Sequence, residues 1–556
     1  MESDFPSPAH DRLMKVAAAI AEILKREGVE FLVSYPVNPI IEACAEADIR
    51  TIVVRQERIG LHMADAYSRV NSGDRIGVFA MQHGPGAENA FGGVAQAYGE
   101  SVPILVLPAG YPRREAQVPP NFNSALNYRH VTKWSEHVPV PEALTEVMRR
   151  AFARLRNGRP RPVLVEVPID LFGQEVAMPL GYTPSFSTRS GPDPSDVSAV
   201  AEVLADARSP VIYAGQGVHY AKAWPQLQEL AELLNAPVTT SLGGKSAFDE
   251  AHPLALGSAG RSTTLAVRRF LDDSDVILGI GCSFTTTTFG LPMPAGKRFI
   301  HATLDPDDLN KDLEVHHPVA GDAQLVLQAL LEELKRRPLP HAEARRGVPD
   351  RIRRLNERWI ADWMPKLSSE EQPLSPYRVI WDLLHTIDPA EAIVTHDAGS
   401  PRDQMSPFWV SREPLSYLGW GKTTQLGYGL GLAMGAKLAR PEKLCVNVWG
   451  DAAIGFTGMD FETAVRERIP ILSILLNNFS MAIEIPIMRV AQEKYGSTDI
   501  SGNYADMARA FGGYGERITE PSEVVPAIRR GIEQTREGTP ALLEFITAKE
   551  YTYPVF

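Results

Sequence analysis

The chain has 556 residues, a formal net charge of −12, and 44% hydrophobic and 22% charged residues. This composition is typical of a globular protein of about two to four domains and excludes a largely disordered chain. The acidic balance excludes general nucleic-acid binding, which needs a basic face.

No apolar run reaches the roughly 18 residues that cross a bilayer, so we expect no membrane partner. The polar, acidic start MESDFPSPAH is unlike a signal peptide. The three cysteines, Cys44, Cys282 and Cys445, lie far apart in apolar surroundings, which predicts buried thiols rather than disulfides or a metal cluster. Together these features predict a protein of the reducing cytoplasm.

Short apolar runs alternate with helix-period segments along the whole chain. The first helix is expected over Ala9–Gly28, amphipathic and ending on a C-cap glycine. The runs are apolar throughout, which suits strands buried on both faces of parallel sheets, and their repetition predicts an α/β fold. The expected strands are Thr51–Val54, Arg75–Met81, Pro103–Ala109, Pro162–Pro168, Pro210–Gly215, Val276–Gly281, Ala392–Gly399, Leu444–Asp451, Ile471–Asn478 and Ala541–Thr547.

Two stretches interrupt this rhythm. Leu180–Asp196 is rich in Pro, Ser and Gly and is typical of a linker, and the stretch from Pro338 to Pro376 combines prolines with a charged helix. YAGQGV, at Tyr213–Val218, lacks the complete glycine fingerprint, so we favour an ordinary strand–helix turn over a nucleotide site. The interruptions divide the chain into three α/β domains: 1–185, 186–350 and 351–556.

One stretch, GDAAIGFTGMDFETAVRERIPILSILLNN, combines polar residues at the ends of two expected strands. Asp451 ends one strand and Asn478 ends another 27 positions later, a span that fits one helix from Asp460 to about Arg468 and a returning strand. Because ligands collect at the carboxyl ends of parallel strands, we expect the two side chains to be neighbours. The alternative is two unrelated turns.

These groups can bind a hard cation and a phosphate. A carboxylate, an amide oxygen and a main-chain carbonyl, that of Ser480, suit Mg²⁺ or Ca²⁺. The backbone N–H groups of Ala452 and Ala453 can donate to a diphosphate.

The motif resembles the signature of thiamin-diphosphate-dependent enzymes of the pyruvate-oxidase and acetolactate-synthase type, which begins with Gly-Asp and ends with Asn-Asn at about this spacing. The resemblance covers the whole chain. It implies the thiamin-diphosphate-binding fold twice, as pyrimidine- and diphosphate-binding domains, around a Rossmann-like middle domain. It also implies thiamin diphosphate and Mg²⁺, with Asp451, Asn478 and the Ser480 carbonyl on the metal and Gly450 opening the signature. Ala452 replaces a residue that is often glycine.

The resemblance further implies an acid that bonds the aminopyrimidine ring and helps it take the proton from the thiazolium carbon. Glu57, after the strand TIVV and at the start of a helix, matches it. The alternative is a glutamate that the helix dipole favours. Shielding from water would raise its proton affinity, and such a group contributes on the order of 10²–10⁴ in rate.

Other cofactor contacts follow from the same resemblance. In the loop MQHGPGAENA, Gly84 and Gly86 allow close backbone approach, while Gln82 and His83 either enter the pocket or are hydrogen-bonded neighbours. Two further candidates lie in the last domain: Leu426 matches the bulky residue that holds the cofactor bent, and Ser400 is a diphosphate contact.

Within this superfamily the chain is most similar to 2-hydroxyacyl-CoA lyases and oxalyl-CoA decarboxylases, and among them to the actinobacterial type that cleaves 2-hydroxyisobutyryl-CoA. The similarity lies in Gly450–Ile471, Gly427–Ala436 and the FGLP of Phe289–Pro292. It implies reversible cleavage of the C1–C2 bond of a 2-hydroxyacyl-CoA to formyl-CoA and a ketone or aldehyde. The alternatives are an acetolactate-synthase-like carboligase, a 2-keto-acid or oxalyl-CoA decarboxylase, and a non-catalytic nucleotide-binding regulator.

The family's Phe-Gln-Glu appears here as Phe122-Asn123-Ser124, so its Gln-Glu chemistry does not transfer, although Asn123 could bond a substrate oxygen. For the acid–base group above the thiazolium, Glu484 and Glu493 are candidates, with Glu493 slightly favoured. The alternative for both is a solvated carboxylate.

An acyl-CoA substrate needs basic residues for its phosphates, and the resemblance implies a homo-oligomer, at least a dimer and plausibly a tetramer. The short tail AKEYTYPVF could place Tyr551, Tyr553 and Phe556 as an aromatic lid. Acyl chain length, physiological direction and ADP or flavin binding in the middle domain stay open. The basic candidates are Arg261, Arg402, Lys422, Arg489 and Lys494.

Overall fold

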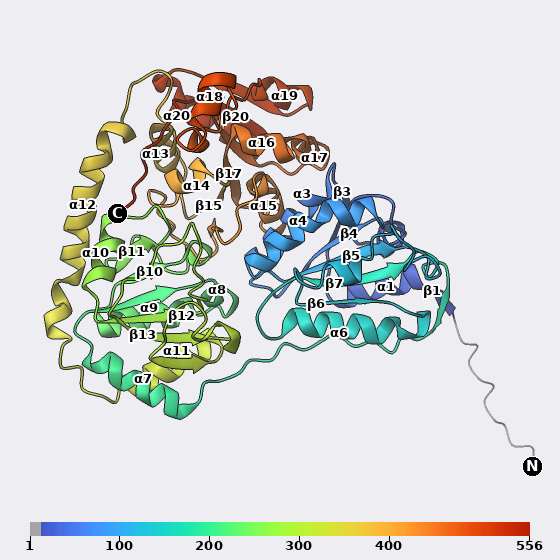
Figure 1. Ribbon diagram of the computed structural model, residues 1–556, viewed down its shortest axis with the longest axis horizontal. Helices are drawn as coiled ribbons and strands as arrows, with labels where there is room; N and C mark the ends of the chain where they lie inside the picture. Colours follow the sequence, from blue (N-terminus) through green and yellow to red (C-terminus); the bar gives the residue numbers. More distant parts are fainter. Residues whose placement is uncertain (1–12) are drawn as a thin grey trace, which may run out of the picture. The chain divides into compact units, whose positions relative to one another are not determined.

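The computed structural model describes residues 13–556. The N-terminal motif MESDFPSPAH and the first residues of the helix expected over Ala9–Gly28 lie outside the described residues. The chain divides into two compact units, of which the first ends at Thr188 and the second begins at Arg189, with Arg69–Ser72 counted in the second. Figure 1 shows the elements of both units. The three expected domain boundaries stay a prediction.

The first unit is built on a six-stranded parallel sheet with the order β3-β2-β4-β5-β7-β6. Its strands are β2 (Phe31–Ser34), β3 (Arg50–Val53), β4 (Gly77–Met81), β5 (Ile104–Gly110), β6 (Trp134–His137) and β7 (Val163–Pro168). Its helices are α1 (Val16–Arg26), α2 (Ile40–Glu46), α3 (Glu57–Val70), α4 (Pro85–Gly99), α5 (Ser124–Asn127), η1 (Pro141–Ala143) and α6 (Leu144–Arg156).

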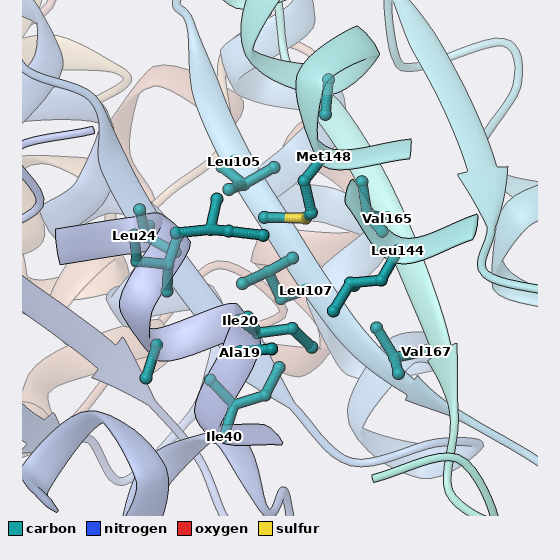
Figure 2. Close-up of a cluster of buried hydrophobic side chains, with 14 of the residues drawn as sticks. Ala19, Ile20, Leu24, Ile40, Leu105, Leu107, Leu144, Met148, Val165 and Val167 are labelled. Atoms are coloured by element: carbon teal, nitrogen blue, oxygen red, sulfur yellow. The ribbon is translucent and has the colours of Figure 1, made fainter. Parts of the chain in front are cut away.

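One core of this unit lies between β5 and β7 and the helices α1, α2 and α6 (Figure 2). The residues of both strands are buried, and all but Glu166 of β7 are apolar, as two-sided burial favours. The labelled side chains in this cluster are Ala19, Ile20, Leu24, Ile40, Leu105, Leu107, Leu144, Met148, Val165 and Val167.

The start of the first expected helix is wrong. Leu13–Lys15 forms a strand, β1, which pairs antiparallel with β8 (Glu175–Ala177) in a two-stranded sheet. The helix begins only at Val16, and the expected terminal glycine follows it, Gly28 having φ +79°. The pairing partner lies about 160 residues later, so helix periodicity alone could not show this strand.

The second unit contains two more six-stranded parallel sheets. The middle sheet has the order β11-β10-β9-β12-β13-β14 and the C-terminal sheet the order β16-β15-β17-β18-β20-β19. The middle strands are β9 (Pro210–Ala214), β10 (Val238–Thr240), β11 (Ala255–Ser258), β12 (Val276–Ile280), β13 (Arg298–Thr303) and β14 (His317–Ala320). The C-terminal strands are β15 (Ala392–His396), β16 (Tyr417–Leu418), β17 (Leu444–Gly450), β18 (Leu472–Asn477), β19 (Tyr514–Ile518) and β20 (Ala541–Ile546).

The helices of this unit come between the strands, as repeated strand–helix units require. They are α7 (Pro194–Asp206), α8 (Gly217–Tyr220), α9 (Trp224–Leu234), η2 (Leu242–Gly244), α10 (Leu265–Asp273), η3 (Pro306–Asp308), α11 (Ala323–Leu334), η4 (Glu343–Gly347), α12 (Val348–Leu367), α13 (Pro376–Thr386), α14 (Ser400–Met405), α15 (Tyr428–Ala439), α16 (Asp451–Thr457), η5 (Gly458–Asp460), α17 (Phe461–Arg466), η6 (Ala482–Glu484), α18 (Arg489–Tyr495), α19 (Tyr504–Ala510), η7 (Pro521–Glu523) and α20 (Val524–Arg536).

The expected fold class is confirmed: three parallel sheets, each flanked by helices. Every apolar run expected to be a strand lies on one. The single helix expected from Asp460 to about Arg468 is wrong in detail, because α16 already starts at Asp451 and α17 ends at Arg466. Among residues 13–556, no helix is long and apolar enough to cross a membrane.

Candidate active site

The ends of β17 and β18 bring the two expected metal-binding segments together. The strands pair in parallel, with Gly450 opposite Leu476, so their carboxyl ends lie side by side. Asp451 directly follows β17, and its Oδ2 accepts a hydrogen bond of 3.0 Å from the N–H of Ser480, beyond β18. The sequence therefore correctly predicted that these segments are neighbours.

The two asparagines at the end of β18 differ in their partners. Asn477 donates from Nδ2 to Glu544 Oε1 at 2.7 Å and accepts from the Phe479 N–H at 3.0 Å. The Oδ1 of Asn478 is buried and has no hydrogen-bond partner. A buried polar atom without a partner is costly, so it indicates a ligand that the protein itself does not supply.

The turn after Asn478 is held firmly. Phe479 has φ +55°, and its carbonyl accepts from the Ile500 N–H at 2.9 Å. The Ser480 hydroxyl donates to the Thr498 carbonyl at 3.1 Å. The residue whose carbonyl is the third expected ligand is thus fixed by a neighbouring segment.

The carboxylate and the amide oxygen fit a hard divalent cation. Asp451 is buried, and burial raises its pKa to about 6, against the N–H groups of Ser480 and Ala452, which favour the ionised form. A bound cation would favour that form further. No group of three or more His, Cys, Asp or Glu side chains suited to a metal occurs among residues 13–556, so one carboxylate with neutral oxygens is what this site offers, a set that suits Mg²⁺ completed by phosphate and water.

The expected diphosphate contacts lie around the start of α16. The Ala452 N–H donates to Asp451 Oδ1 at 2.9 Å, so in this structure it supports the carboxylate. Ala453 is buried in the first turn of the helix. Gly450 lies against Pro401 of α14, since a Cβ there would be 3.9 Å from the Pro401 Cγ.

Ser400, at the start of α14, has a partner in the C-terminal tail. Its Oγ lies 2.8 Å from the Tyr553 hydroxyl, and burial raises the pKa of that tyrosine. The tail is anchored on both sides of Tyr553, because the Thr552 carbonyl accepts from Tyr377 at 2.6 Å and the Pro554 carbonyl accepts from the Thr263 N–H at 2.9 Å. Of the expected aromatic lid, Tyr551 and Phe556 are about half exposed, at 48% and 49%.

The segment before α15 carries Leu426, which is half-buried. The next residue, Gly427, has φ +85°, and its carbonyl accepts from the Thr457 hydroxyl at the end of α16 at 2.8 Å. A Cβ at Gly427 would lie 2.7 Å from that Thr457 Oγ1, so only glycine fits there.

Sequence reasoning missed Asp397, the residue that follows β15. It is fully buried, and its carboxylate accepts from the N–H groups of Ala398 at 2.7 Å, Gly427 at 2.9 Å and Gly429 at 2.8 Å. Burial raises its pKa to about 6. The available signal was its place after an apolar strand, the same pattern that marked Asp451.

In the first unit, Glu57 opens α3 and is 3% exposed. Burial raises its pKa, and a hydrogen bond with Asn89 acts in the other direction. A Cβ on Gly86 would lie 3.3 Å from Glu57 Oε1, so the glycine lets α4 approach the carboxylate closely. A shielded carboxyl group with raised proton affinity suits proton transfer at neutral pH.

The loop before α4 has the expected close approaches. Gly84 has φ +61°, and a Cβ there would lie 2.6 Å from the Tyr111 hydroxyl. The His83 ring meets Tyr111 edge-on at 4.6 Å, and its Nδ1 is buried without a partner. The Gln82 Oε1 accepts from the Val37 N–H at 3.3 Å. His83 thus keeps a vacant ring nitrogen, whereas Gln82 has a partner within the protein.

Asn123 has a structural role in this unit. Its Oδ1 accepts from the Leu126 N–H at 2.8 Å and caps α5. Glu166 supports the same turn by accepting from the Ser124 N–H at 2.7 Å. The cap accounts for Asn123 without a substrate.

The two acid–base candidates differ in burial. Glu484 is half-buried at the end of η6. Glu493 lies on α18, none of whose residues is buried, and its side chain is 68% exposed with Arg489 3.8 Å away. Burial therefore favours Glu484, in contrast to the preference expected from the sequence.

Arg402 is the one basic candidate that is fully buried. It forms a two-bond ion pair with Asp403, at 2.9 Å for each bond, and its guanidinium lies 4.0 Å over the Phe289 ring. The pair lies in the interior rather than on an open surface for phosphates, although it leaves the buried Nη1 of Arg402 without a partner. Arg261, Arg489 and Lys494 are exposed and Lys422 is half-buried.

The glycine turn YAGQGV is a packing feature. A Cβ on Gly215 would lie 2.4 Å from the Gly281 carbonyl, and the Gly217 N–H donates to that carbonyl at 2.8 Å. The glycines therefore let the ends of β9 and β12 approach each other, which agrees with an ordinary turn.

Three domain models of one enzyme family match this chain, one for each of its three parallel sheets. The N-terminal TPP binding domain of thiamine pyrophosphate enzymes matches residues 14–135, their central domain residues 197–330, and their C-terminal TPP binding domain residues 397–545. The chain belongs to the thiamine pyrophosphate enzyme family.

Its curated relatives include acetolactate synthase large subunits that match over nearly their whole length. The chain is 30% identical to that of Parasynechococcus marenigrum over 91% of this chain and 83% of the relative. It is 28% identical to the "Acetolactate synthase isozyme 3 large subunit" of Escherichia coli, over 98% and 96%. It is also 28% identical to a "Probable acetolactate synthase large subunit" of Methanocaldococcus jannaschii, over 96% and 92%. These relatives support the expected alternative, a carboligase, better than the expected acyl-CoA lyase.

Proposed function

We propose that this protein is an acetolactate-synthase-like enzyme that uses thiamin diphosphate and Mg²⁺ to decarboxylate a 2-keto acid and join the remaining acyl unit to a second carbonyl compound. The observation that carries the proposal is the similarity to acetolactate synthase large subunits over nearly the whole of both chains. When bound, the cofactor supplies a carbon nucleophile and an electron sink for the carbanion left after bond cleavage.

Different residues of this chain bind the metal, transfer the proton and contact the cofactor in this proposal. Asp451, Asn478 and the Ser480 carbonyl hold the metal, on the support of the buried carboxylate and the unpaired amide oxygen. Glu57 exchanges a proton with the aminopyrimidine ring, on the support of its burial and raised pKa. Ser400 and Leu426 contact the diphosphate and the body of the cofactor.

The acid–base group above the cofactor has a better candidate in Glu484 than in Glu493. Glu484 is half-buried and follows the turn that carries Asn478 and Ser480. His83, with its vacant Nδ1, is a second polar group suited to a substrate oxygen.

The test is an assay of the purified protein with thiamin diphosphate, Mg²⁺ and pyruvate. We expect release of CO₂ and formation of acetolactate, or of acetaldehyde if the enzyme is only a decarboxylase. The Glu57→Ala variant should fold and show no turnover. Failure of the wild-type protein to bind the cofactor in calorimetry would contradict the proposal and support a non-catalytic regulator.

A second candidate is the reversible 2-hydroxyacyl-CoA lyase, which the run Gly450–Ile471 favours by its resemblance to those enzymes. Three accessible basic residues, Arg261, Arg489 and Lys494, could meet the CoA phosphates. The same preparation should be given 2-hydroxyisobutyryl-CoA, and formyl-CoA and acetone measured. Formyl-CoA release without acetolactate formation would replace the first proposal by this one.

The family resemblance also supports a homo-oligomer, with a dimer as the minimum and a tetramer as the larger form. Light scattering of the purified protein tests this proposal, and a monomer at micromolar concentration would contradict it.

A further inference from the structure

Asp397 is a buried carboxylate whose hydrogen-bond partners are all backbone groups of this chain. It directly follows β15 and is 0% exposed. Burying an ionised group is costly unless hydrogen bonds replace water, and here three backbone N–H groups replace it.

Two of the three bonds reach a segment about 30 residues further along the chain. Oδ1 accepts from Gly427 and Oδ2 from Gly429, the residue before α15 and one in its first turn. A carboxylate in this position is also stabilised by the positive, N-terminal end of the α15 helix dipole. Asp397, which follows β15, therefore caps the N-terminus of α15 although it is distant from it in the sequence.

The bonded N–H of Gly427 belongs to the peptide that joins it to Leu426. Because a peptide is planar, the bond from Asp397 fixes the orientation of the whole Leu426–Gly427 unit. On its other side, Gly427 accepts from Thr457 at the end of α16, the helix that begins with Asp451. One turn is thus held between the residue after β15 and the helix after β17.

The fit around this turn is tight. A Cβ on Gly429 would lie 3.0 Å from the His396 carbonyl and 3.2 Å from Asp397 Oδ2, and one on Gly427 would lie 2.7 Å from Thr457 Oγ1. The close approach that lets these bonds form therefore requires glycine at both positions.

We propose that Asp397 is a positioning residue for the cofactor site: through the turn at Gly427–Gly429 it holds Leu426 in register with the metal-binding helix α16. The inference rests on the proposed function, because it is the bound cofactor that Leu426 contacts. Both carboxylate oxygens of Asp397 accept from backbone N–H groups, so its effect is exerted through the turn.

The sharpest variant is Asp397→Asn. Its single oxygen can still accept from Ala398 and Gly427, but its NH₂ faces the Gly429 N–H, so two donors oppose each other. Two readouts besides activity are the dissociation constant of thiamin diphosphate with Mg²⁺, from calorimetry, and the near-ultraviolet circular dichroism of the bound cofactor.

We expect a cofactor dissociation constant about 10-fold higher than that of the wild type, as for one lost bond to a charged group, and an altered dichroism band. The matched control is Asp322→Ala in the middle domain, which removes a carboxylate that accepts from the Gln324 and Leu325 N–H groups. The control should lower the unfolding temperature and leave both cofactor readouts unchanged.

If Asp397→Asn fails to fold, Thr457→Val tests the same turn from its other side, with Thr457→Ser as the variant that keeps the hydroxyl. The valine variant should weaken cofactor binding and the serine variant restore it. Wild-type affinity and an unchanged dichroism band in Asp397→Asn, or in both Thr457 variants, would overturn the inference. A wild-type protein that binds no cofactor would instead overturn the proposed function.

Discussion

The ends of β15 and β17, neighbouring strands of one sheet, present two buried aspartates with different surroundings. Burial raises the pKa of Asp397 and of Asp451 to about 6, and both accept backbone N–H bonds. Both carboxylates have backbone donors on both oxygens, but Asp451 lies beside the Asn478 turn, whose amide oxygen has no partner. Burial and a raised pKa therefore do not by themselves distinguish a ligand from a support, and the unpaired oxygen of Asn478 is what favours Asp451 as the proposed ligand.

Glu57 extends this comparison to a third buried carboxylate, with proton transfer as its proposed role, and its replacement should have the largest effect. Glu57→Gln keeps the shape but cannot accept or give a proton, so kcat should fall by about 10²–10⁴. Cofactor affinity should change far less, as calorimetry would show. A variant with near-wild-type turnover would contradict the assigned role.

Asp451→Asn should act on binding instead. Replacing an outer-shell partner of a metal costs about 10–100-fold in affinity, so loss of the charged ligand should raise the Mg²⁺-dependent dissociation constant of thiamin diphosphate by at least roughly 100-fold. The control is Asp397→Asn, for which we expect the smaller change described above. Equal losses in the two variants would remove the distinction between ligand and support.

Much of the fold, and the neighbouring ends of β17 and β18, could be predicted because the signals are local. Mostly apolar runs such as β17 and β18 are long enough to stand out, and Gly-Asp and Asn-Asn mark where they end. Short edge strands do not stand out: β16 has two residues, and its place in the sheet depends on pairing with β15. Local signals therefore find inner strands better than edges.

The rest of the site depends on contacts between distant residues. The role of Asp397 is set by donors about 30 residues away, and no spacing rule connects them. The exposure of Glu493 follows from α18 having no buried face, which the sequence pattern of that segment did not indicate. The cap at Asn123 had a local signal that the sequence analysis did not use, since asparagine before a short helix is a known N-terminal signal.

The two asparagines after β18 sharpen the comparison at smaller energies. Asn477→Ala leaves Glu544 Oε1 and the Phe479 N–H without these partners, so the free energy of unfolding should fall by about 1–3 kcal/mol. Asn478→Ala removes an oxygen that has no partner, so the stability of the protein without cofactor should not fall, while Mg²⁺-dependent cofactor binding weakens by about 10-fold. Denaturant unfolding measures the stability of both variants, and calorimetry measures their cofactor binding. A destabilised Asn478→Ala apoprotein would contradict this prediction.

The smallest effect is expected at Asn123, which the sequence placed among the catalytic candidates and the structure places at the N-terminus of α5. If capping is its whole role, Asn123→Ala should lower the free energy of unfolding by about 1 kcal/mol and change kcat/KM by no more than about twofold. Asn123→Asp separates the two roles, because aspartate also caps a helix but cannot donate a hydrogen bond from its side chain to a substrate oxygen. Stability restored together with lost activity in the aspartate variant would assign Asn123 to the substrate after all, whereas stability and activity both retained would group it with Asp397, among the polar residues that the protein uses for its own backbone.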